Sequence, residues 1–147
     1  MNNHPYLRAY MAGIAVPTPL LLVALTLFSV ARFVYNVPIP VERVIIFPMA
    51  IVPNLFGVWN VLRVASGSRL PLGIHGAILP FILAPLGFFL GRGLGFLKTT
   101  AYGFNYFDVV QVHYVHVALV FPAVLIVYYL VWKYLIGFFN RVAGIAE

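Results

Sequence analysis

Three histidines inside apolar segments are the side chains best suited to chemistry in this sequence. His113 and His116 are three residues apart, so on a helix their imidazole rings would be neighbours on one face. Two such rings can share a metal ion or bind beside a haem or a quinone head group. We therefore treat His113 and His116 as the candidate cofactor-binding residues, although no cofactor is indicated by a complete motif.

A complete metal or catalytic site would need ligands that the sequence does not supply. The carboxylates expected at the same membrane surface as the pair are Glu42 and Asp108, and the chain has no cysteine. His75 is expected near the opposite surface, which disfavours a haem held between His75 and the pair. The favoured alternative for the pair is a polar cluster at the membrane surface, hydrogen-bonded to Arg32, Arg43 or Arg92.

Asp108 has a structural explanation that competes with a catalytic one. Asp108 and Gln111 stand three residues apart before an apolar run, as in a variant of the capping box. A carboxylate there would accept hydrogen bonds from free amides and lie at the positive end of the helix dipole. We expect this capping role, and we predict no catalytic residue and no metal site.

The composition places the segments that carry these residues in a membrane. The chain is 63% hydrophobic and 8% charged, whereas soluble domains carry about 25% charged residues. The span from Asp108 to Trp132 would be roughly 36 Å long as a helix, enough to cross a hydrocarbon core of about 30 Å. We predict an all-α integral membrane bundle, a single domain over residues 1–147, with four transmembrane helices at about 9–30, 44–65, 71–90 and 109–137.

The third predicted helix contains more glycine and proline than the others. Lipid cannot satisfy a broken backbone, so Pro80 and Pro85 favour burial of this helix in protein. Glycines let helices approach closely in a membrane. We expect the third helix to be the packing centre, through Gly73, Gly76, Gly87 and Gly91.

Other polar residues within or beside the spans are candidates for lining a polar cavity. Asn54 follows Pro53, which removes a backbone hydrogen bond and frees the carbonyl of Met49. The favoured interpretation is that Asn54 satisfies this backbone, and a cavity is the alternative. The full set of cavity candidates is Asn54, Asn60, His75, Arg43, Glu42 and Asp108.

The connection between residues 91 and 108 is rich in aromatic residues and contains Lys98. This composition is typical of a segment in the lipid head-group region, and we expect an interfacial loop or a short interfacial helix there. The connection lacks the strand and the lysine motif of a phosphate-binding loop.

The distribution of charge predicts contact with membrane lipids. The formal net charge is +6, which favours anionic head groups. The basic residues are spread over every loop, which argues against nucleic acid as a partner. The side with the termini carries five basic residues and the other side four. This bias favours cytoplasmic termini, and we expect a bacterial cytoplasmic membrane.

The leading functional hypothesis is a non-catalytic accessory or scaffold subunit of a membrane complex. Four short helices bury little surface among themselves, so we expect a homo-oligomer or other membrane subunits as partners. The first alternative is a redox or ligand-binding subunit that holds a haem, a metal or a quinone near His113 and His116. The second alternative is an oligomeric channel or a small transporter.

Overall fold

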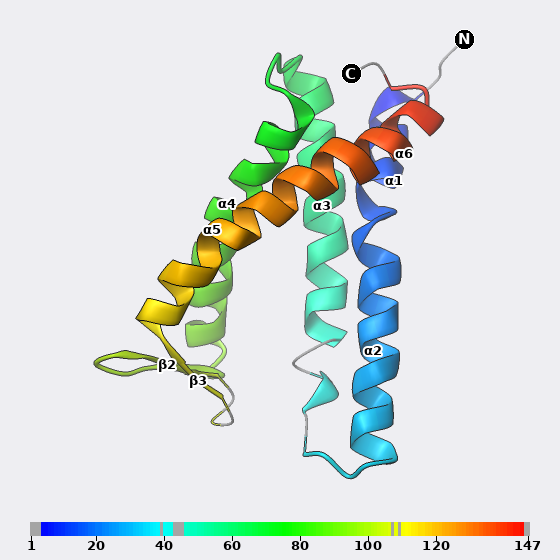
Figure 1. The fold of residues 1–147 in the computed structure, drawn as a ribbon. Coiled ribbons are helices and arrows are strands. Elements are labelled where there is room, and N and C mark those ends of the chain that lie inside the picture. The colour runs from blue at the N-terminus through cyan, green and yellow to red at the C-terminus, as the bar shows by residue number, and fades with distance from the viewer. Residues whose placement is uncertain (1–3, 39, 43–45, 107, 109, 146–147) are drawn as a thin grey trace. The chain divides into compact units, whose positions relative to one another are not determined.

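The computed structural model describes residues 4–38, 40–42, 46–106, 108 and 110–145. The chain divides into two compact units, the first formed by Met1–Leu70 with Tyr134–Glu147 and the second by Pro71–Lys133. The elements, shown in Figure 1, are α1 (Pro5–Ile14), α2 (Pro17–Phe33), α3 (Phe47–Ser66), α4 (Leu72–Gly93), β1 (Leu97–Thr99), β2 (Gly103–Tyr106), β3 (Val110–His113), α5 (Tyr114–Leu130), the π-helical turn η2 (Val131–Ile136) and α6 (Gly137–Val142).

Four helical stretches of the described chain are long and apolar enough to cross a membrane. They are Pro5–Phe33, which joins α1 and α2, then α3, then α4, and finally Tyr114–Val142, which joins α5, η2 and α6. The fold is therefore mostly helical and fits a multi-pass membrane protein. The prediction of an all-α fold needs one correction, because β1, β2 and β3 form a small sheet.

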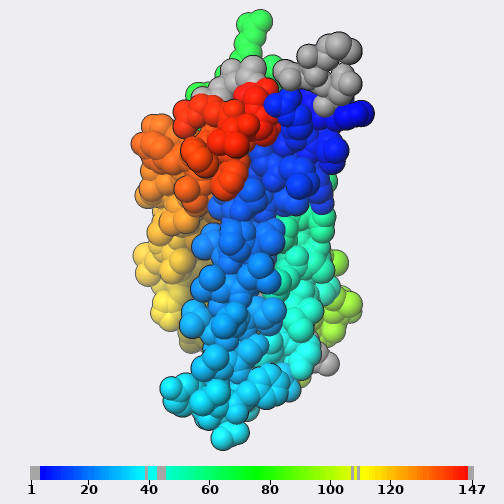
Figure 2. All heavy atoms as spheres, turned by 90° about the vertical axis from the view of Figure 1, so that its right-hand side faces the viewer, coloured from blue at the N-terminus to red at the C-terminus, as the bar shows by residue number. Residues whose placement is uncertain are grey.

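The first unit is built on the close packing of α1 against α3. A Cβ added to Gly13 would lie 2.6 Å from the backbone oxygen of Phe56, so only glycine allows this approach. Ala9 and Ala12 of α1 are buried and form a small apolar core with Ile145, which follows α6. Figure 2 shows α1 and α6 side by side at one end of this unit.

The second unit is built on α4 packed against the helix that runs through α5 into η2. A Cβ on Gly73 would lie 2.6 Å from the ring of Tyr129. The rings of Phe81 and Phe121 meet edge to face, with centroids 5.1 Å apart. Tyr129 of α5 therefore packs against Gly73 of α4, and Phe121 of α5 packs against Phe81 of α4.

The hairpin between α4 and α5 replaces the interfacial helix considered from the sequence. β1, β2 and β3 pair antiparallel, with Lys98 opposite Asn105 and Asn105 opposite Gln111. The fourth helix begins at Tyr114 and not at 109, because Val110–His113 is a strand. Valine alternates with a polar residue in this strand, and a period of two residues is typical of β structure.

Candidate functional site

A pair of fully buried asparagines forms the polar centre of the first unit. The side chains of Asn60 on α3 and Asn140 on α6 exchange two amide hydrogen bonds, at 2.8 and 3.3 Å. Asn60 Nδ2 also donates to the carbonyl of Ala9 on α1, at 2.8 Å. The pair thus joins three helices and leaves no side-chain amide group without a partner, so it acts as a structural link.

Arg63 lies one turn beyond Asn60 on α3, and its burial is harder to explain. The residue is only 7% exposed, and its Nε atom has no hydrogen-bond partner. No hydrogen bond or ion pair joins its side chain to another residue in the described ranges. A buried charge is costly unless a partner balances it, so this guanidinium is a candidate ligand for an anion.

Two further polar candidates of the first unit, Asn54 and Glu42, have partners within that unit. Asn54 donates to the carbonyl of Ala50 at 2.6 Å and accepts from the hydroxyl of Tyr10. It therefore bonds to a backbone carbonyl one turn back, but the carbonyl is not that of Met49. Glu42 forms an ion pair with Arg32 at 2.7 Å, and the candidate Arg43 lies outside the described residues.

His75 is buried in the second unit, in the first turn of α4. It is 7% exposed, and its ring lies edge to face with the indole of Trp132 on η2, with centroids 5.8 Å apart. The next residue, Gly76, has no room for a Cβ because Trp132 occupies that position. His75 is therefore part of the packing between α4 and η2.

His113 and His116 lie together at the start of α5, with ring centroids 5.6 Å apart and the ring planes nearly perpendicular. Both side chains are exposed, and His113 adopts an extended conformation where β3 meets α5. The described residues contain no group of three or more metal-ligating side chains. Since α4 and α5 run in opposite directions, His75 lies at the other end of this helix pair.

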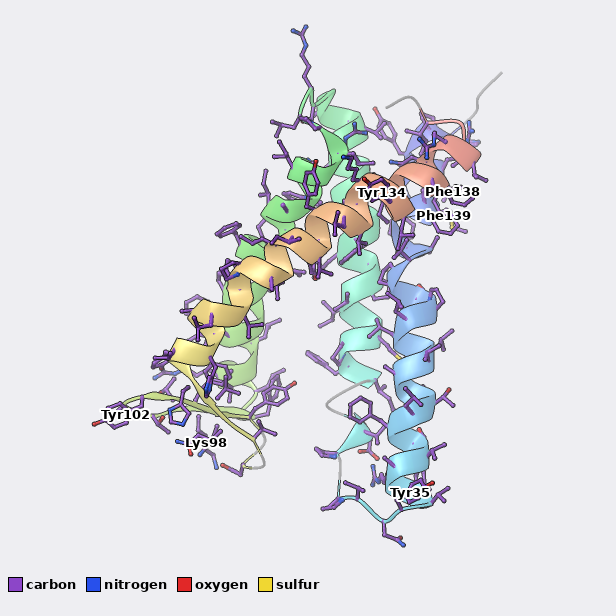
Figure 3. All side chains as sticks on the ribbon, viewed as in Figure 1. Tyr35, Lys98, Tyr102, Tyr134, Phe138 and Phe139 are labelled. Carbon is purple, nitrogen blue, oxygen red and sulfur yellow. The ribbon has the colours of Figure 1, made fainter. Side chains whose placement is uncertain are left out.

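Asp108 does not cap the fourth helix, and the capping-box prediction is wrong. The residue lies between β2 and β3 with φ of 57°, six positions before α5 begins. Its carboxylate accepts a hydrogen bond from Nζ of Lys98 on β1, at 2.6 Å. Figure 3 shows Lys98 on this hairpin and the exposed ring of Tyr102 at one tip. Asp108 thus stabilises the hairpin at its surface.

Tyr106 is a further titratable group in the hairpin. Its ring meets that of Phe96 edge to face, with centroids 5.8 Å apart. Burial raises the pKa of the Tyr106 hydroxyl above its ordinary value of 10.0, because an apolar environment disfavours the charged phenolate.

The four glycines proposed for helix packing have different surroundings. Gly73 and Gly76 face Tyr129 and Trp132, as described above. Gly91 is buried against Phe96 and Leu97, so it packs on the hairpin and not on a helix. Gly87 is exposed, and a Cβ added there would meet nothing within 4 Å. A role for Gly87 in packing would therefore require a partner from outside the chain.

Sequence reasoning did not identify Arg63 or Asn140 as site residues. Arg63 is three positions after Asn60, and this spacing places both on one face of α3. This shared face with a polar cavity candidate was the feature of the sequence that could have identified Arg63. Asn140 carried a weaker signal, since it follows Phe138 and Phe139 in a short segment whose partner cannot be read from spacing.

Comparison with known proteins adds no family to this geometry. No family model, curated protein or solved structure matches the chain.

Proposed function

We propose that this protein is a non-catalytic accessory or scaffold subunit of a membrane assembly. The observation that carries the proposal is the surface of α5, a 17-residue helix in which no residue is buried. Leu119 is 72% exposed and Ile126 is 61% exposed. Apolar surface of this extent needs lipid or another protein against it.

The contacts of the polar residues favour a structural role. The carboxylates of Glu42 and Asp108 are held in ion pairs, and the amides of Asn60 and Asn140 bond to each other. Acyl or phosphoryl transfer would need a nucleophile beside a base, or paired carboxylates. In the described part of the chain these groups serve to join elements of the fold.

The test uses a glycine that has no neighbour within the chain. A Cβ added at Gly87 would meet no atom within 4 Å, so we expect Gly87→Leu to leave the folded chain intact and to weaken only contacts with a partner. Gly93 on the same helix is equally open but lies on another face, so Gly93→Leu is the matched control. Each variant is extracted from membranes in mild detergent, and its mass is measured by light scattering.

We expect the unmodified chain and Gly93→Leu to be recovered in an assembly larger than one 16.4 kDa chain. Gly87→Leu should be recovered mainly as a folded single chain. A monodisperse single chain for the unmodified protein would overturn the proposal.

The second candidate function is a ligand-binding or redox subunit, and the arrangement of His113 and His116 favours it. Their rings are adjacent and exposed, so a haem, a metal ion or a quinone from outside the chain could reach both. If the purified protein absorbs visible light, replacing both histidines by alanine should remove the absorbance. The control, His75→Ala, should keep it, and loss of the band in this control alone would contradict the assignment.

A further inference from the structure

We infer that the first unit binds the phosphate group of an anionic phospholipid, with Arg63 as its principal ligand. The site lies in the last turn of α3, at the end of the unit where α1 and α6 meet, and Figure 2 shows this contact of α1 with α6. The inference rests on the membrane location within the proposed function. It does not require the accessory role.

Arg63 provides the chemical basis for the site. A guanidinium has five donors and no acceptor, and it cannot lose its proton in a protein. Arg63 is 7% exposed, and its Nε atom has no hydrogen-bond partner among the described residues. Two oxygens of a phosphate group can accept parallel hydrogen bonds from the planar guanidinium. The phosphate would also supply the negative charge that balances Arg63.

The charges of the first unit are unevenly distributed between its ends. Among the described residues of the first unit, the carboxylate is that of Glu42. It forms an ion pair with Arg32 at the end where α2 connects to α3. The opposite end carries Arg63 and three further arginines, and no described carboxylate of the unit lies there. Excess positive charge at one end attracts an anion. The three further arginines are Arg8, Arg69 and Arg141.

Arg8 has a structural role that Arg63 lacks. Its guanidinium lies against Gly144, where α6 has ended and φ is 64°. The carbonyl groups at the end of a helix attract a positive charge, so this position accounts for Arg8. The link between Asn60 and Asn140 holds α3 to α6 one turn away from Arg63. The helices around Arg63 are therefore joined before a ligand binds.

The position in the fold favours a lipid as the source of the phosphate. Arg63 lies in the last turn of a helix long and apolar enough to cross a membrane, at the level where head groups occur. The aromatic residues Tyr134 and Phe138, labelled in Figure 3, are exposed along the helix that runs into α6. Exposed aromatic rings beside arginines are typical of the membrane surface.

The experiment measures thermal unfolding of the purified protein in maltoside micelles. Phosphatidylglycerol and phosphatidylcholine are added at equal mole fractions, and inorganic phosphate is added in a third series. The variant Arg63→Met removes the charge but keeps an unbranched apolar side chain. Arg69→Gln is the matched control, because Arg69 is exposed and follows α3 at the same end.

We expect phosphatidylglycerol to raise Tm of the unmodified chain and of Arg69→Gln more than phosphatidylcholine does. Arg63→Met should lose this difference, and its apparent affinity for phosphatidylglycerol should fall about tenfold or more. Without anionic lipid, Arg63→Met should be at least as stable as the unmodified chain, since it buries no uncompensated charge. This second readout shows that the variant is folded.

Three results would overturn the inference. The first is an equal phosphatidylglycerol effect in Arg63→Met and the unmodified chain. The second is an equal effect of inorganic phosphate, which would assign the site to a free anion. The third is that phosphatidylglycerol does not raise the Tm of the unmodified chain while Glu147→Gln lowers its stability. This pair of results would mean that the Glu147 carboxylate, and not a lipid, balances the charge of Arg63. None of these results depends on the assembly measured for Gly87→Leu.

Discussion

Replacing Asn140 by leucine tests the link that joins α6 to α3. The change removes both hydrogen bonds to Asn60 and leaves Oδ1 of Asn60 buried without a donor. A buried polar group without a hydrogen-bond partner costs about 1–3 kcal/mol. An individual hydrogen bond between two membrane helices contributes about 0.6 kcal/mol on average. One of the two bonds is long, at 3.3 Å. We therefore expect Asn140→Leu to lower the free energy of unfolding by about 1–2 kcal/mol.

Asn60→Leu should cost more, because it also removes the hydrogen bond to the carbonyl of Ala9. The double variant should be less destabilised than the sum of the two single variants, by about 1 kcal/mol. The reason is that two leucines leave no unsatisfied amide in the pair, and replacing both partners of a buried hydrogen bond can be nearly neutral.

The assay is unfolding in mixed micelles of dodecyl sulfate and maltoside, followed by circular dichroism and by the fluorescence of the two tryptophans, Trp59 and Trp132. Thr26→Val is the control, because the Thr26 hydroxyl donates to the carbonyl of Leu22 within its own helix and to no other group in the described part of the chain. This control should change the free energy of unfolding by less than about 0.5 kcal/mol. Additive losses in the double variant would refute the reasoning, since they would mean that the two amides do not interact.

Three further predictions concern the second unit. Gly76→Ala should lower the free energy of unfolding by about 1–3 kcal/mol, because Trp132 fills the position of the new methyl group. The control Gly87→Ala should leave the stability unchanged or raise it. An equal decrease of Tm in the two variants would contradict the packing of Gly76 against Trp132. The pKa of Tyr106 is raised, so the folded state holds its proton to higher pH than the unfolded state does. Its contribution to stability is therefore present below pH 10 and declines as the pH rises above 10; Tyr106→Phe should flatten this part of the pH profile, and an unchanged profile would show that another group titrates there. Asp108→Asn should cost less than about 1 kcal/mol and make unfolding less sensitive to salt, because the pair with Lys98 is exposed; a larger loss would mean that Asp108 does more than hold the hairpin.

The extent of the apolar segments could be predicted because hydropathy is a local property. The predicted spans 44–65 and 71–90 differ from α3 and α4 by at most three residues at each end. The start of the fourth helix was wrong by five residues, and α5 begins only at Tyr114. Val110–His113 pairs with β2. Such pairing depends on the position and register of a second strand, and hydropathy carries no information about either.

The sequence by itself determined that this chain carries four segments suited to a membrane, because their apolar composition follows from residue type alone. The spacing of His113 and His116 predicted neighbouring rings on a helix, and the rings are neighbours although His113 lies in β3, with centroids 5.6 Å apart. Only the tertiary structure joined Asn60 to Asn140, across eighty positions of the chain. It also decided that Arg63 is buried while Arg69 is exposed. Burial depends on which helices pack around a side chain, and in a membrane the close contacts that decide this packing cannot be read from hydrophobicity.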